Sequence, residues 1–140
     1  MIGETPDGLR VNFGITGGEI VGKRFNATVE TGGADALRIR QDGTAILAVR
    51  TTLKTDDGAR IFTEYSGVLD LGEDGYHRAL NGDFPPKPRV HLAPRFVSAS
   101  PAYSWLNRLQ CIGIGYVTMA DLEVNYDLYA MHLADSGSAP

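Results

Sequence analysis

The sequence predicts an all-β protein, an antiparallel meander of about eight strands that closes into a β-barrel. Asp-Gly or Gly-Gly pairs punctuate much of the chain, and such pairs accept the positive φ angles that tight hairpins require. Between these pairs, apolar and polar residues alternate, as expected for strands with one buried face. The pairs are Gly17-Gly18, Gly32-Gly33, Asp42-Gly43 and Asp57-Gly58.

The bulk composition is that of one globular domain. At 140 residues the chain is long enough for a single core, and we expect a barrel domain at 1–133 and a disordered tail at 134–140. A net charge of −4 argues against a nucleic-acid partner. No apolar run is long enough to span a membrane, and the N-terminus lacks the pattern of a signal peptide. One cysteine, Cys111, fits a reducing compartment, so we expect a cytoplasmic protein.

The first half of the chain contains five expected strands. In Leu9–Ile15 every second residue is apolar, which indicates one buried face. Further strands are expected at Glu19–Glu30, Ala36–Gln41, Thr44–Lys54 and Arg60–Asp70. Both faces of the last two are partly apolar, so we expect each face to be covered.

The second half begins with an irregular connection, 71–88, which is rich in glycine and proline, and no helix is expected. A strand at Arg89–Val97 is weakened by Pro94, and Ser98–Asn107 is a crossing segment. The last strands are expected at Leu109–Thr118 and Leu122–Met131. A closed eight-stranded barrel, lipocalin-like in shape, holds packed side chains or one small ligand. A sandwich with open edges is the alternative.

Four motifs follow one another along the chain. They are Gly32-Gly33-Ala34-Asp35, Asp42-Gly43, Val49-Arg50-Thr51-Thr52-Leu53 leading to Thr55-Asp56-Asp57-Gly58-Ala59-Arg60-Ile61, and Tyr103-Ser104-Trp105-Leu106-Asn107-Arg108. In this order they resemble the DUF3237 family, also called UPF0311, and the resemblance extends from about Leu9 to Met131. It implies an antiparallel β-barrel and leaves the function largely undefined. The chain departs from the family pattern at Ala36-Leu37, at Ala48 and at Phe96-Val97-Ser98, so a site built on the usual polar groups there would be altered.

Arg50 is the first catalytic candidate, because it lies in the middle of a strand whose two faces both look covered. A buried guanidinium must be paired, so it would present a fixed fork of donors to a carboxylate, enolate or phenolate. The alternatives are a structural ion pair with Asp35 or Glu64, or a solvated side chain.

Three further residues complete the catalytic set. Asp35 follows two glycines at a strand edge and is a candidate general base, although an aspartate there often bonds its own turn. Tyr65 shares a strand face with Ile61 and is a candidate phenol donor. His91 is the one histidine inside an expected strand and is a candidate proton carrier, with a core or edge role as its alternative.

Four residues are candidates for substrate binding. Trp105 and Tyr103 are expected to form a pocket wall, and Asn107 to orient a carbonyl. Gly113 lies on the same strand face as Gly115, where missing side chains leave room for a ligand. The alternatives are core packing for Trp105, a backbone cap for Asn107 and a bend at the glycines.

These residues lead to two main hypotheses and a third. The first is a cofactor-independent lyase, isomerase or cyclase acting on a small, partly apolar, carbonyl-bearing molecule. The second is a carrier of a small hydrophobic ligand, and the third is an interaction protein with a filled barrel. No metal is expected, because the histidines are scattered, and no cofactor motif is present. A homodimer is expected through the outer face of 44–54 and 60–70.

Overall fold

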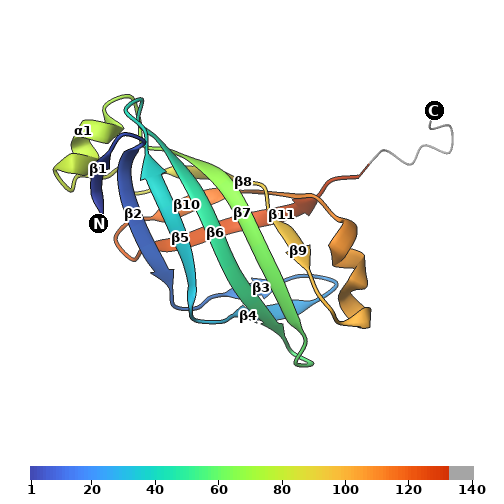
Figure 1. The fold of residues 1–140 in the computed structure, drawn as a ribbon. Helices are drawn as coiled ribbons and strands as arrows, with labels where there is room; N and C mark the ends of the chain where they lie inside the picture. The colour runs from blue at the N-terminus through green and yellow to red at the C-terminus, as the bar shows by residue number, and fades with distance from the viewer. Residues whose placement is uncertain (133–140) are drawn as a thin grey trace, which may run out of the picture.

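The computed structural model describes residues 1–132, which form one antiparallel sheet of 11 strands (Figure 1). The tail expected at 134–140 lies outside these residues. No helix in the described part is long and apolar enough to cross a bilayer. The strands are β1 (Gly3–Thr5), β2 (Gly8–Ile15), β3 (Glu19–Val21), β4 (Asn26–Val29), β5 (Gly33–Ile39), β6 (Thr44–Thr55), β7 (Arg60–Asp70), β8 (Arg89–Leu92), β9 (Arg95–Val97), β10 (Cys111–Thr118) and β11 (Glu123–Ala130).

The glycine pairs lie where the sequence predicts turns. They connect β2 to β3, β4 to β5, β5 to β6 and β6 to β7. One glycine of each pair has a positive φ, for example 84° at Gly43 and 87° at Gly58. Residues with side chains rarely adopt this backbone region, so these positions favour glycine.

Two long central strands organise the sheet. β6 has 12 residues and pairs along one edge with both β5 and β4, each covering a different part of it. β7 has 11 residues and is shared in the same way by β8 and β9. Each long strand extends beyond its first neighbour, so the sheet divides into two branches at the end that carries β3, β4 and β9 (Figure 1).

Two of the expected strands are each divided into two in the structure. The expected strand Glu19–Glu30 is the hairpin β3–β4, in which the amide of Gly22 donates to the side chain of Asn26. The expected strand Arg89–Val97 is broken into β8 and β9, because Pro94 has no N–H to donate to a ladder.

The prediction that the chain has no helix is wrong. Helix α1 (Gly75–Leu80) lies inside the segment expected to be irregular, and a 3-10 helix, η1 (Pro101–Arg108), forms the crossing segment. Each of these is too short for a sequence pattern of period 3.6 to reveal it. Tyr76 of α1 is buried and donates its hydroxyl to Glu4, which ties the helix to β1.

The sheet folds over itself, and β10 and β11 cross behind the strands from β2 to β7 (Figure 1). Its path runs β1-β2-β5-β6-β7-β8-β10-β11, and within residues 1–132 no backbone pairing joins β11 to β1 or β2. The fold is therefore barrel-like, but hydrogen bonds do not close it as the expected barrel requires.

The interior contains two separate hydrophobic cores. The first core lies at the end covered by α1, and the second core lies at the end covered by η1. The first core consists of Leu9, Val11, Leu37, Ile39, Ala45, Leu47, Val49, Leu69, Leu71, Tyr76, Ala79, Val90, Leu92 and Val117. The second core consists of Ala27, Leu53, Ile61, Phe96, Leu106 and Cys111.

The close approach of β10 to β11 gives the first prediction. A Cβ added at Gly115 would collide with the carbonyl oxygen of Asn125 on the paired strand. We expect Gly115→Ala to lower the free energy of unfolding by about 1–3 kcal/mol in chemical denaturation. Gly14→Ala is the matched control, because nothing lies within 4 Å of its added Cβ. Equal stabilities of the two variants would contradict this packing.

Candidate functional site

The expectation that Arg50 lies inside the sheet is wrong. The side chains of Val49, Thr51 and Leu53 face inward, so Arg50 faces outward, and its side chain is 79% exposed. Its Nε lies 3.3 Å from Glu64 Oε2 on β7, which is the structural ion pair named as an alternative. Its neighbour Ile46 on the same outward face made this face look buried in the sequence.

His91 is also on the outer face of the sheet. It is paired with Val68 on one side and Ile114 on the other, and all three side chains are exposed. Val90 and Leu92, which flank it, supply the inward contacts of this strand. His91 therefore cannot act on a ligand held inside the sheet.

Trp105 and Tyr103 lie beside the second core. Phe25 packs edge-on against both rings with centroids 6.0 Å away, and the Arg24 guanidinium lies 3.5 Å from the centre of the Trp105 ring. Tyr103 also donates to Asp57. These contacts attach the β3–β4 hairpin to η1, so the two rings close the end of the fold.

Asn107 has the backbone-capping role. Its Oδ1 accepts from the Ser98 amide at 2.8 Å, and its Nδ2 donates to the Ser98 carbonyl at 3.2 Å. The whole amide is used in holding the turn between β9 and η1, so no polar atom remains directed at a substrate.

The two cores are separated by a band of small and polar residues, which we call the polar band. On β6 it is Thr51, placed between Val49 of the first core and Leu53 of the second. Corresponding inward positions on three other strands are also small or polar. The polar band consists of Gly33 and Asp35 on β5, Thr51 on β6, Thr63 and Tyr65 on β7, and Gly113 and Gly115 on β10.

Asp35 is the acidic member of the polar band. Its Oδ1 accepts a hydrogen bond from the Ala48 amide at 2.9 Å, and the β5–β6 pairing is interrupted between Asp35 and Arg38. The carboxylate thus replaces a backbone acceptor at this point of the ladder. Burial raises the pKa of Asp35 above its usual 3.8, although the bond from Ala48 lowers it in part.

Tyr65 and Tyr126 face each other across the interior. Their ring centroids are 6.4 Å apart at an interplanar angle of 63°. Burial raises the pKa of both phenols, and the nearby charge of Asp35 raises that of Tyr65 further. Both phenols are therefore neutral at physiological pH, and each hydroxyl has a proton to donate.

Tyr126 was not among the candidates, although two glycines point to it. Gly115 pairs with Tyr126, and a Cβ added at Gly113 would lie 2.9 Å from its ring. The two glycines on one face of β10 therefore leave room for a large side chain on β11. The space that Gly113 leaves on this face is thus occupied in part by Tyr126, and its expected role in substrate binding stays a prediction.

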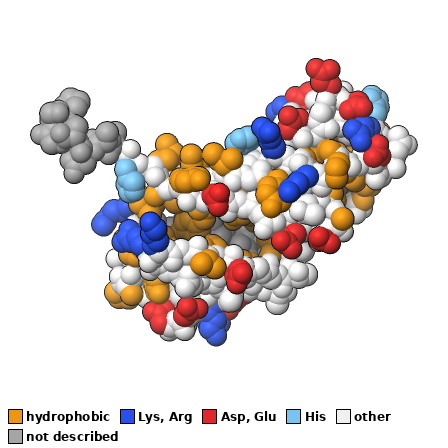
Figure 2. Space-filling model, turned by 180° about the vertical axis from the view of Figure 1, so that it is seen from behind, with side chains coloured by type: hydrophobic (Ala, Val, Ile, Leu, Met, Phe, Trp, Pro, Cys, Tyr) orange, Lys and Arg blue, Asp and Glu red, His pale blue; other side chains and the backbone are white. Residues whose placement is uncertain are grey.

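A hollow opens onto the interior of the fold. Figure 2 shows it near the centre of the rear face, with hydrophobic side chains at its floor. Several residues packed against the two cores are only partly buried. They include Phe13, Ile15, Tyr65, Tyr126 and Leu128.

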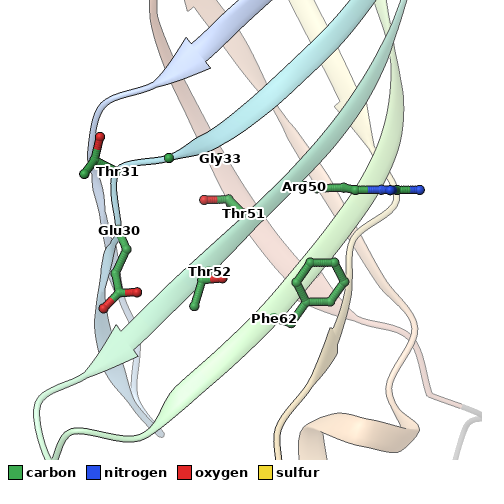
Figure 3. Close-up of a pocket in the computed structure, with 8 residues that line it drawn as sticks. Glu30, Thr31, Gly33, Arg50, Thr51, Thr52 and Phe62 are labelled. Carbon is green, nitrogen blue, oxygen red and sulfur yellow. The ribbon is translucent and has the colours of Figure 1, made fainter.

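Thr51 is the one buried side chain among the described residues whose polar atom has no hydrogen-bond partner. It is 7% exposed. On β6 it lies opposite the turn that connects β4 to β5, and it lines a groove of about 310 Å³ there (Figure 3). Figure 3 shows its side chain on the side of Gly33, with Arg50 extending away from it. A Cβ at Gly33 would lie 2.7 Å from the Thr51 hydroxyl. Elsewhere in residues 1–132, no three His, Cys, Asp or Glu side chains gather as a metal site would need.

The unpaired hydroxyl gives the second prediction. We expect Thr51→Val to raise the free energy of unfolding by about 1 kcal/mol, because it removes a buried group that lacks a partner. Thr63→Val is the matched control, since Thr63 is equally buried but donates to the Arg95 carbonyl at 2.9 Å. It should lose about 1 kcal/mol. Denaturation curves that shift in the same direction for both would contradict the assignment.

The raised pKa of Asp35 gives the third prediction. The folded state favours the protonated carboxyl, so its stabilisation is complete below pH 3.8 and is lost as the pH rises through the folded-state pKa. Asp35→Asn keeps an acceptor for Ala48 and carries no charge. We expect thermal melts to show it more stable than wild type at pH 7, with the gain shrinking as the pH falls. A variant that is less stable at pH 7 would contradict this.

Comparison with known proteins agrees with this fold. The model of a family described as a protein of unknown function (DUF3237) matches residues 1–131. A UPF0311 protein from Clostridium acetobutylicum is 32% identical over 71% of this chain, and the alignment spans 64% of that protein. Another from Rhodopseudomonas palustris is 32% identical over 79% of this chain and 74% of its own length.

Solved structures show the same architecture. A protein of unknown function from C. acetobutylicum has a TM-score of 0.76 at 26% identity, covering 88% of this chain and 81% of the other. A beta-barrel like protein from Acinetobacter baumannii has a TM-score of 0.67 at 28% identity, covering 91% and 84%. An enzyme from Penicillium herquei shares the fold at a TM-score of 0.58 and 24% identity, covering 80% and 77%. The chain belongs to the DUF3237 family.

Proposed function

We propose that this protein is a cofactor-independent enzyme that removes a proton from the carbon next to a carbonyl group of a small, partly apolar molecule bound in the hollow. The supporting observation is a partly buried carboxyl, Asp35, that faces the same interior as two partly buried phenols, Tyr65 and Tyr126. A base and a set of oxyanion donors in one partly desolvated space are the two components that this chemistry needs.

Strand pairing places the base and the donors on opposite sides of one residue. Asp35 and Tyr65 are both paired with Val49, so their Cα atoms lie two strand spacings apart, about 10 Å. Their side chains rise from the same inner face, and the buried Val49 lies between them. A flat carbonyl compound that bridges them would have the carboxylate at one end and the phenols at the other.

The reaction begins when the Asp35 carboxylate takes the proton from the α-carbon. The C–H electron pair moves into the new carbon–carbon double bond, and the carbonyl oxygen becomes an enolate. Tyr126, with the Tyr65 ring beside it, donates its hydroxyl to that oxygen. Burial makes Asp35 a stronger base than a solvated carboxylate, which favours the transfer.

Three reactions pass through such an enolate without a cofactor. Return of the proton to another carbon isomerises the molecule, and departure of a group from the β-carbon with its bonding electron pair is a lyase reaction. In the reverse direction, addition of a nucleophile of the same molecule to the β-carbon of an unsaturated carbonyl compound forms the enolate and closes a ring, and the protonated Asp35 then gives its proton to the α-carbon. Tyr65 and Tyr126 stabilise the enolate oxygen in all three.

The alternative is a carrier that holds a small hydrophobic ligand unchanged. The partly buried aliphatic and aromatic residues that face the hollow favour it, since they supply apolar surface without chemistry. A carrier has no need of the Asp35 carboxyl, so the two functions differ in what Asp35→Asn does.

Proton exchange with solvent gives the fourth prediction and needs no knowledge of the natural substrate. In D₂O, the wild-type protein should speed deuterium incorporation next to the carbonyl in members of a panel of cyclic ketones and 1,3-diketones, followed by mass spectrometry. Asp35→Asn should lower that rate by at least about 100-fold, and Tyr126→Phe by about 10–100-fold. Arg50→Met is the control, because Arg50 is on the outer face and should leave the rate unchanged.

Binding of a panel compound without any enhanced exchange would contradict the enzyme and support the carrier. Full activity of Asp35→Asn would contradict the role of Asp35 even if the protein is an enzyme.

A further inference from the structure

The outer face of β8, β10 and β11 is organised in three columns. The middle column, on β10, is apolar and exposed, with Ile114 at 48%. The column on β8 is basic, with Arg89 and His91 preceded by Lys87, and the column on β11 carries Glu123 and Asp127. Figure 2 shows a continuous run of hydrophobic side chains near the end of the molecule from which the C-terminal segment leaves.

Strand register fixes the rows of this face. His91, Ile114 and Asp127 form one row, and Arg89, Tyr116 and Asn125 form the next. Beyond them, Thr118 pairs with Glu123, and the Lys87 ammonium lies 4.0 Å from the centre of the Tyr116 ring. In the other direction Ile112 pairs with Tyr129, which is 53% exposed. Positive charge is therefore on one side of the apolar column, and negative charge is on the other.

We propose that this face binds a second copy of the same chain, with the two sheets packed face to face about a two-fold axis parallel to β10. A rotation of 180° about that axis brings the basic column of one copy over the acidic column of the other. In each copy His91 then faces Asp127 of its partner, and Arg89 faces Asn125 between Glu123 and Asp127. The apolar column lies on its own equivalent.

This arrangement satisfies the usual requirements of sheet packing. Aligned sheets stack about 10 Å apart, a spacing that side chains of the size of isoleucine and tyrosine fill from both sides. A two-fold interface must be self-complementary, because both copies use the same surface: where one residue of the first copy contacts a second residue of the other copy, the reverse contact also forms. A face with charge of one sign would repel its copy, whereas this face carries both signs on opposite sides of its apolar centre.

The charge pattern of this face favours a second copy of the chain over other binding partners. A nucleic acid or an anionic membrane would require one sign of charge, and the acidic column opposes both. The proposal does not depend on the reaction assigned to the hollow, because the face is on the opposite side of the sheet. It also moves the dimer surface from the expected outer face of β6 and β7 to that of β8, β10 and β11.

The fifth prediction is a charge-reversal cycle measured by sedimentation velocity. Wild type should be a dimer at micromolar concentration. His91→Glu and Asp127→Lys should each raise the dimer dissociation constant by about tenfold or more, because the first places two acids opposite each other and the second places a lysine against the basic column, each at two symmetric positions. The double variant H91E/D127K should regain most of the affinity, since its introduced acid and base face each other across the axis.

Two controls make the cycle decisive. Lys54→Glu, on the exposed outer face of β6, should leave the dimer intact. Circular dichroism and melting temperatures of the single variants should match wild type, because the changed side chains are exposed. A monomeric wild type, single variants that dimerise as wild type does, or a folded double variant that fails to recover would each overturn the proposal.

Discussion

The inner face of β6 changes from apolar to polar at Thr51 and back again within five residues, from Val49 to Leu53. No continuous hydrophobic core can pass across this point, because burying an unpaired polar group costs more than an aliphatic contact gains. The neighbouring strands follow the same division, with Asp35 on β5 and Thr63 on β7 at adjacent positions. Two cores with a space between them are the result, and every functional inference about the interior depends on that space.

The residues around this space are costly for folding. Asp35 interrupts the β5–β6 ladder and is partly buried as a carboxyl, and the hydroxyl of Thr51 has no partner. Tyr65 and Tyr126 lose solvent around their hydroxyls, which raises the pKa of both. Groups that weaken a fold at adjacent positions of one cavity are typical of sites kept for binding or chemistry, where stability and activity oppose each other. Sites for metal-independent proton transfer fit this pattern well, since they need polar groups held away from water.

The hairpins and the strand faces of the first half of the chain could be predicted, because glycine pairs and the alternation of Leu9–Ile15 are local signals. The face of Arg50 could not, because a shift of one residue exchanges the two faces of a strand and the outer face of β6 also carries Ile46. Asp35 was a candidate base from its position after two glycines, whereas Tyr126 could not be selected, because its place depends on a pairing between Gly115 and β11 that no local pattern reveals. Incomplete closure of the sheet likewise depends on contacts between distant strands.

The two proposals thus assign different roles to the two faces of one sheet, chemistry to the inner face and self-association to the outer face. A crystal structure with 4-nitrophenol tests the inner role most directly, because its phenolate has the charge and planarity of an enolate. We expect the ring in the hollow between the two cores, with its oxygen within hydrogen-bonding distance of the Tyr126 hydroxyl. A compound found only on the outer surface, or a hollow filled by rearranged side chains, would contradict the proposed site.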